Sequence, residues 1–175
     1  RELFSGLGKD FPRLSLGCYF AELTEALTAE GEESGELLRH LLNGLYAIEN
    51  FRRPPELLRA AFELRAMSLA GYEPLLEGCA FCGKEQPEEP VLDLASGVLR
   101  CRRCGSGGAG MPLDGDALAA ARHVLYGDPK RLYGFTLGEE SLRRLSAAAE
   151  AFTLAQLERG FRTLDYYKSL RGMEG

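Results

Sequence analysis

Four cysteines in two close pairs are the feature that most constrains the fold of this chain. Their spacing is Cys79-x2-Cys82-x18-Cys101-x2-Cys104. Structural zinc takes four ligands at tetrahedral corners, and a Cys-x2-Cys turn can place two sulfurs on one ion. The spacing therefore predicts one zinc ion, bound by two turns that a short hairpin brings together.

A glycine follows each pair directly, Gly83 after the first and Gly105 after the second. Glycine adopts positive φ without steric strain, so we expect both turns to curl tightly and direct backbone amides at the sulfurs. Because cysteines would fill all four ligand positions, no position stays open for a substrate or an activated water. The predicted zinc is therefore structural and not catalytic.

Two disulfides or an iron ion are alternatives for the same four cysteines. Disulfides are disfavoured because no export signal is recognisable, which predicts a reducing cytoplasmic compartment. Iron accepts a tetrahedral sulfur shell and stays an alternative. The fifth cysteine, Cys18, is predicted to be a small buried residue of the first helix. No apolar run reaches the roughly 18 residues that a membrane helix needs, so no membrane partner is expected.

Apolar residues recur at helical spacing on both sides of the cysteines. They predict helices near residues 14–27, 34–50, 56–70 and 114–126, and a long one from Glu139 that continues past Gly160. The helix at 56–70 is apolar around most of its circumference, which is typical of a central buried helix.

Residues 75–110, here named the cysteine segment, have a different pattern. Two short strand-like runs at 91–94 and 97–100 predict a short β-hairpin. The expected fold is mainly α, a helical bundle with an inserted zinc ribbon of four cysteines. The expected organisation is a first helical part at 1–74, the zinc-ribbon insertion at 75–110 and a second helical part at 111–175.

The net charge is −5, from 21 basic and 26 acidic residues. This balance excludes a globally basic nucleic-acid binder, but two local basic groups stand out. Arg100, Arg102 and Arg103 adjoin the second cysteine pair and are candidates for weak contacts to DNA phosphates. The second group surrounds the predicted central helix, and it fits an anion such as phosphate or an acidic peptide; it includes Arg52, Arg53 and Arg59.

The chain is predicted not to be an enzyme. His40 and His123 are its only histidines, and neither has a nucleophile or acid partner at a recognisable spacing. Two alternatives stay open at this point, a zinc-ribbon transcription factor and an enzyme with a purely structural zinc. Glu85, Glu88 and Glu89 make the ribbon acidic, which disfavours the transcription factor.

Several segments resemble the RecO family of recombination mediator proteins, and the likeness covers nearly the whole chain. The paired Cys-x2-Cys-Gly turns match the zinc-binding members of that family. The other matching runs are Tyr19-Phe20-Ala21-Glu22-Leu23, Phe62-Glu63-Leu64-Arg65, Leu69-Ala70-Gly71-Tyr72-Glu73-Pro74 and Phe161-Arg162-Thr163-Leu164.

The resemblance implies a part of a bacterial, cytoplasmic, nucleoid-associated DNA repair and recombination protein. Family members begin with an oligonucleotide-binding barrel, and Arg1-Glu2-Leu3-Phe4 looks like the linker after it. The chain is therefore expected to be the C-terminal part of a longer protein. The implied activities are strand annealing and recombinase loading, and the implied partners are RecR and single- and double-stranded DNA, which is bound mainly by the barrel.

A further implied partner is the acidic C-terminal tail of single-stranded-DNA-binding protein, which ends in a hydrophobic side chain. Such a tail needs cations for its carboxylates and an apolar slot for its end. The residues predicted to dock it are Arg52, Arg53, Arg59, Leu58 and Phe62.

Overall fold

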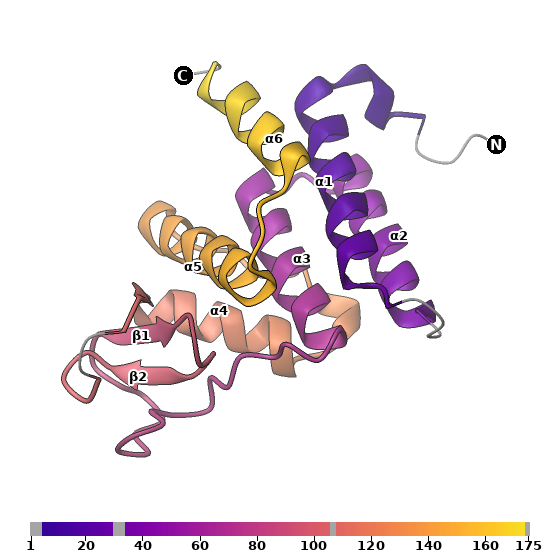
Figure 1. The fold of residues 1–175 in the computed structure, drawn as a ribbon. Coiled ribbons are helices and arrows are strands. Elements are labelled where there is room, and N and C mark those ends of the chain that lie inside the picture. The colour runs from indigo at the N-terminus through magenta and orange to yellow at the C-terminus, as the bar shows by residue number, and fades with distance from the viewer. Residues whose placement is uncertain (1–4, 30–33, 106–107, 174–175) are drawn as a thin grey trace.

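A computed structural model describes residues 5–29, 34–105 and 108–173 (Figure 1). The predicted linker at residues 1–4 lies outside these ranges. The described elements are mainly helical, with a small antiparallel sheet between the third and fourth helices. In chain order they are η1 (Leu7–Lys9), α1 (Phe11–Leu27), α2 (Gly35–Asn50), α3 (Pro55–Leu69), β1 (Pro90–Asp93), β2 (Leu99–Cys101), β3 (Gly110–Pro112), α4 (Gly115–Tyr126), η2 (Pro129–Arg131), α5 (Glu139–Leu157) and α6 (Arg162–Gly172).

Helix α3 is the centre of the helical body, the name used here for α1 to α6. It packs against α1, α2, α4 and α5, and most of its residues are buried, which confirms the prediction. Pro55 begins the helix, at a position where the missing N–H breaks no helical hydrogen bond. Gly71, with φ of +90°, reverses the chain just beyond its end.

Close packing between α2 and α3 depends on Gly44. The rings of Phe20 and Phe62 stack with centroids 3.7 Å apart, and His40 stacks on the other side of Phe62 at 4.3 Å. A Cβ on Gly44 would lie 2.8 Å from the Phe62 ring, so a larger residue would push these elements apart. This stack joins α1, α2 and α3 into one core.

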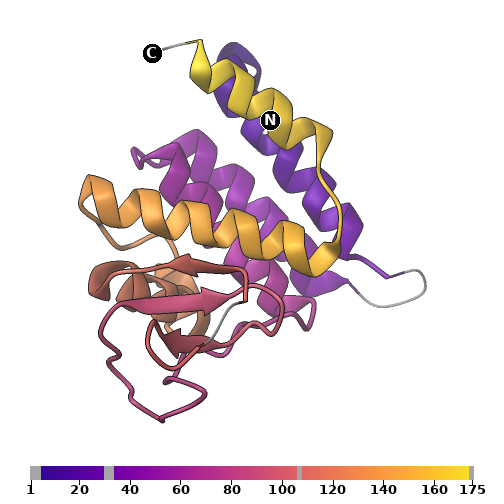
Figure 2. The same ribbon diagram turned by 60° about the vertical axis from the view of Figure 1, so that its left-hand side comes forward.

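The sheet has the strand order β2-β1-β3, and both pairings are antiparallel. Val91 pairs with Arg100 on β2 and with Pro112 on β3. The predicted hairpin is therefore present, and β3 adds a strand that Gly110-Met111-Pro112 does not signal by any apolar alternation. Figure 2 shows the sheet beside α5, where Gln156 Nε2 donates to the Leu94 and Ala95 carbonyls.

Two expectations about the helices are wrong. The predicted long final helix is two helices, because Glu158 adopts a left-handed conformation (φ 50°) that ends α5. The turn sends α6 back onto α1, where Phe161 meets the Tyr19 ring edge-on at 5.7 Å. Cys18 is exposed and not buried, because Tyr19 and Phe20 carry the buried face of α1 at this point.

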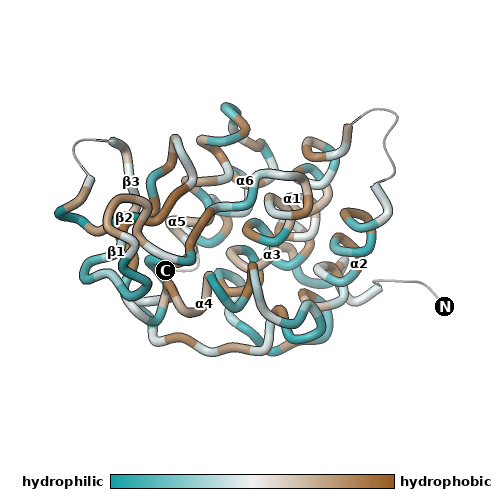
Figure 3. The backbone as a smooth tube through the Cα atoms, turned by 90° about the horizontal axis from the view of Figure 1, so that it is seen from below, coloured by the Kyte–Doolittle hydropathy of each residue, from teal (hydrophilic) through white to brown (hydrophobic). Residues whose placement is uncertain are grey.

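The helices carry both hydrophobic and hydrophilic residues along their length (Figure 3), but α3 is buried on most sides. No described helix is both long enough and apolar enough to cross a membrane. In Figures 1 and 3 the sheet lies at one end of the molecule and α2 lies at the other.

Candidate metal centre and basic groove

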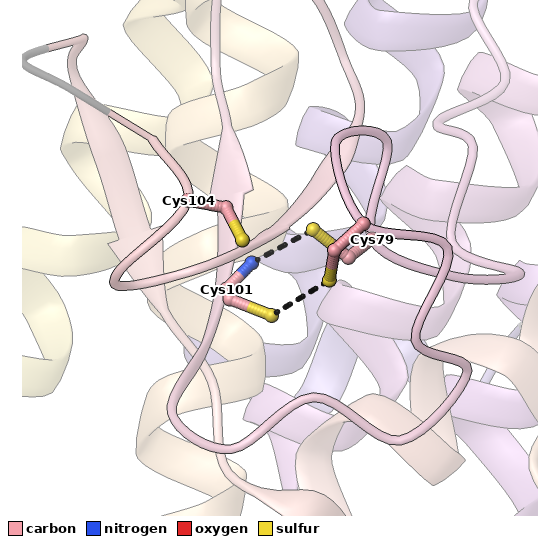
Figure 4. Close-up of side chains that lie close together, drawn as sticks. Cys79, Cys101 and Cys104 are labelled. Carbon is pink, nitrogen blue, oxygen red and sulfur yellow. Dashed lines mark hydrogen bonds between the residues drawn. The ribbon is translucent and has the colours of Figure 1, made fainter.

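The four cysteines of the two pairs converge as predicted from their spacing. Their sulfurs all lie within 4.8 Å of one another, and Cys82 Sγ is 3.7 Å from Cys101 Sγ. A tetrahedral ion with bonds of about 2.3 Å requires sulfurs about 3.8 Å apart. Figure 4 shows Cys79, Cys101 and Cys104 with their side chains gathered around one point. The donor set and its spacing fit a tetrahedral metal ion, which these four residues could hold.

The first turn is closed by backbone hydrogen bonds. Gly83 N donates to Cys79 O at 2.8 Å, and Cys79 N donates to Lys84 O at 2.9 Å. Gly83 has φ of +73°, which confirms the expected role of glycine here. Cys101 N donates to Cys79 Sγ at 3.3 Å. Burial raises the pKa of the Cys79 thiol, but the backbone hydrogen bonds to its sulfur outweigh burial and lower the pKa to about 6.

Gly105 serves a different purpose from the one predicted. It is not among the glycines with positive φ, and a Cβ there would overlap the Arg100 side chain. Arg100 is buried, lies 3.5 Å from Asp93 Oδ2 and donates to Gly108 O. The prediction that Arg100 contacts DNA is therefore corrected, because its guanidinium is occupied inside the ribbon.

Arg102 and Arg103 are exposed beside the second turn. Arg102 forms an ion pair with Glu89 at 3.2 Å. The structure thus leaves two of the three predicted phosphate-binding arginines on the surface.

The predicted tail-docking set is divided by the structure. Arg59, Leu58 and Phe62 are buried in the core, so these three residues do not form an exposed docking surface. Arg59 Nη1 lies 3.0 Å from Glu63 Oε1 and 3.0 Å from Glu150 Oε2. The sequence of α3 is apolar on most sides, so the pattern alone does not show which side chains face the core. The structure shows that Arg59, Leu58 and Phe62 do.

Arg52 and Arg53 instead line a groove of about 870 Å³, named here the basic groove. Its walls come from α2, the connector between α2 and α3, the end of α3, and residues 129–134 after α4. Among the described residues that line it, Glu36 is the only acidic one. Its basic residues are Arg39, Arg52, Arg53, Arg65, Lys130 and Arg131.

These six cations differ from Arg59 and Arg100, whose guanidinium groups are paired with carboxylates. None of the six forms an ion pair with a carboxylate in the described ranges. Arg65 donates to the Leu125 carbonyl at 3.3 Å, which fixes it at the α4 side of the groove. A groove with this charge, on a chain of net charge −5, has a local electrostatic potential that favours anions.

Aromatic rings line part of the same groove. Tyr46 meets Phe51 edge-on with centroids 5.9 Å apart, and Phe51 meets Tyr133 at 6.3 Å. Burial raises the pKa of Tyr133, so this residue stays a neutral phenol. The groove therefore combines an apolar aromatic surface with cations, the two features that an acidic peptide with a hydrophobic end requires.

Sequence reasoning missed the contribution of residues 129–134 to the groove. Lys130 and Arg131 lie just after the helix predicted at 114–126 and belong to no recognisable motif. His123 Nε2 lies 2.8 Å from Arg131 O, which fixes this segment to α4. His40 contacts Phe62 O at 3.0 Å, and burial lowers its pKa to about 4, so it is a neutral packing residue at pH 7.

Comparison with known proteins agrees with the resemblance. The profile of a family described as "Recombination protein O C terminal" matches residues 8–165. A protein of Symbiobacterium thermophilum, named DNA repair protein RecO, is 32% identical over 97% of this chain and 69% of its own length. Proteins with the same name from Acetivibrio thermocellus and Streptomyces griseus are 24% and 30% identical, over 97% and 92% of this chain and 68% and 64% of their own lengths. The chain therefore belongs to the RecO family of DNA repair proteins.

Proposed function

We propose that this chain is a non-enzymatic docking module of a DNA repair and recombination mediator, which assists strand annealing and recombinase loading. The observation that carries the proposal is the basic groove, with six cations and an aromatic surface in a chain of net negative charge. The ligand we propose for this groove is the acidic, hydrophobic-ended C-terminal tail of single-stranded-DNA-binding protein.

The chemistry of the groove suits such a tail. Arginine pairs with carboxylates in a bidentate way, and the groove presents arginines from two of its walls, Arg52 and Arg53 from the connector and Arg131 from residues 129–134. The terminal hydrophobic side chain would contact the rings of Phe51 and Tyr133. This assignment keeps Arg52 and Arg53 from the sequence prediction and replaces the buried Arg59.

Calorimetry with a tail peptide tests this site. We expect binding in the micromolar range for the wild-type chain, and at least tenfold weaker binding for the Arg52→Ala, Arg53→Ala double variant and for Arg131→Ala. Arg143→Ala is the matched control, because Arg143 is an exposed arginine on α5 outside the groove. Wild-type affinity in the groove variants would place the tail elsewhere.

We propose that the metal is zinc and that its role is structural. Cys79, Cys82, Cys101 and Cys104 would supply all four ligands, and the ion would join the two turns of the ribbon. Elemental analysis is expected to give one zinc per chain. Iron in its place would be detected in the same measurement and would correct the assignment.

We also propose weak contacts to DNA through Arg102 and Arg103, while the main DNA affinity and the RecR contact belong to the whole mediator. Glu89 beside Arg102 keeps this contact weak and sensitive to salt. A double alanine variant is expected to bind single-stranded DNA less tightly, with a shallower dependence on salt. An unchanged salt slope would remove this surface from the proposal.

A further inference from the structure

Arg122 of α4 contacts the chain on both sides of the first cysteine turn. Its Nε donates to Leu76 O at 2.8 Å, and its Nη2 donates to Glu77 O at 3.0 Å and to Glu85 O at 2.5 Å. Leu76 and Glu77 precede Cys79, and Glu85 follows Cys82. One guanidinium therefore joins the start and the end of the loop that carries two candidate ligands.

The adjacent turn of α4 strengthens this attachment. Tyr126 lies four residues after Arg122, on the same face of the helix. Its hydroxyl accepts from Leu76 N at 3.0 Å and donates to Pro74 O at 3.3 Å. The path of the chain into the first turn is thus set by α4.

This arrangement reduces the conformational freedom that a metal ion would otherwise have to remove. The chain loses conformational entropy when the two ends of a loop are brought together. Arg122 holds the ends of this loop together by hydrogen bonds that do not involve the ion. The planar guanidinium makes three directed bonds at once, whereas the ammonium of lysine has no such fork.

We propose that Arg122 is a positioning residue for the metal centre, which holds the first cysteine turn in its ligand geometry and thereby raises metal affinity. The inference rests on the proposal that the four cysteines bind zinc. Groups beyond the ligands that orient them typically change metal affinity by about 10- to 100-fold when they are removed. Arg122 is expected to act in this range.

The test measures zinc affinity of the full chain by competition with a chromophoric chelator. Arg122→Ala and Arg122→Lys are both expected to bind zinc about 10- to 100-fold more weakly than wild type. Arg122→Lys keeps the charge and most of the side chain, so it decides the question if Arg122→Ala does not fold. The visible spectrum of the cobalt-substituted protein reports ligand geometry, and we expect a weaker or altered tetrahedral thiolate spectrum in both variants.

Gln156→Ala is the matched control. Gln156 also bonds two carbonyls of the ribbon, those of Leu94 and Ala95, but at the end away from the cysteine turns. Its loss is expected to leave zinc affinity and the cobalt spectrum unchanged. Absence of zinc binding by the wild type would refute the metal assignment itself. Zinc binding by wild type and Arg122→Lys with equal affinity, or an equal loss in Gln156→Ala, would overturn the role of Arg122.

Discussion

The centre of the helical body and the cysteine segment differ in what their buried atoms contact. Around α3 the buried side chains are largely apolar and touch other apolar side chains from four helices. The cysteine segment has few buried hydrophobic residues among those described. These residues are Leu76, Cys79, Val91, Leu92, Leu99 and Cys101, and the two cysteines among them are candidate ligands. The first region is stabilised by apolar burial, and the second has too little of it to fold alone.

The attachment between the two regions has an apolar part and a polar part, because Leu76, Leu92 and Leu99 pack into the same core as the helices. Arg122, Tyr126 and Gln156 hold the cysteine segment through its backbone carbonyls and amides. Contacts of this kind fix position, but each adds little net stability. We therefore expect the ion to stabilise the ribbon locally, while the helical body keeps its fold without it.

The largest expected effect comes from removing a ligand. Cys101→Ser is expected to lose the metal and to unfold the ribbon, because structural zinc in small domains contributes on the order of 10 kcal/mol of folding free energy. Hydrogen exchange should become fast in residues 79–101 and stay slow in α1, α2 and α3. Cys18→Ser is the control, since Cys18 is exposed on α1. Slow exchange throughout the metal-free ribbon, or collapse of the whole chain, would contradict the local role of the ion.

The next effect tests a buried ion pair in the helical body. Arg59 is paired with Glu63, which is fully buried, and with Glu150. Arg59→Ala leaves the Glu63 carboxylate without its cation, so we expect a loss of about 3–5 kcal/mol in the free energy of unfolding. Urea denaturation of the metal-loaded protein measures it. Arg143→Ala, at an exposed pair with Glu140, should change stability little. Equal urea midpoints for both variants would show that loss of the buried ion pair does not lower the free energy of unfolding by this amount.

Local patterns predicted the convergence of the four cysteines and the existence of the helices. The two Cys-x2-Cys turns are each four residues long, and their meeting needs only a hairpin between them. The direction of a side chain on α3 is a different matter. Arg59 is predicted to belong to an exposed docking set together with Arg52 of the preceding connector. It lies instead on the buried face of α3, where it pairs with Glu150 from α5. Only the packed structure brings that carboxylate to α3.

The basic groove could not be predicted for a similar reason. Arg52 and Arg53 were identified as candidates, but Lys130 and Arg131 reach the same groove from a segment more than seventy residues later. Strand β3 and the break at Glu158 were missed because neither carries a local signal. The groove, strand β3 and the turn at Glu158 depend on contacts between segments that are distant in the sequence, and a local pattern does not contain those contacts.

The smallest expected effect concerns the contact that returns α6 to α1. Glu22 on α1 accepts from Thr163 N at 3.1 Å and from the Thr163 hydroxyl, and it lies 3.6 Å from Arg159. Thr163 lies in the first turn of α6, and the partial positive charge at the N-terminus of a helix favours a negative side chain there. The hydrogen bond from the Thr163 hydroxyl is the main cause that lowers the pKa of Glu22 below 4.5. The carboxylate therefore stabilises the fold above about pH 4.5, and this stability is lost as the pH falls through its lowered pKa.

Glu22→Gln tests this charge with little change in shape. At pH 7 we expect the variant to be less stable by about 1 kcal/mol, the usual size of a charged contact at a helix N-terminus. As the pH falls through the lowered pKa of Glu22, the wild-type carboxyl takes up a proton, so the two proteins should approach equal stability. Urea denaturation of both proteins from pH 3 to 7 measures the difference, and any loss of metal in acid affects both alike. A difference that does not change with pH would assign the stability to the shape of the side chain and not to its charge. A difference that vanishes in acid would show that α6 is held to the helical body by charge as well as by the apolar contact between Phe161 and Tyr19.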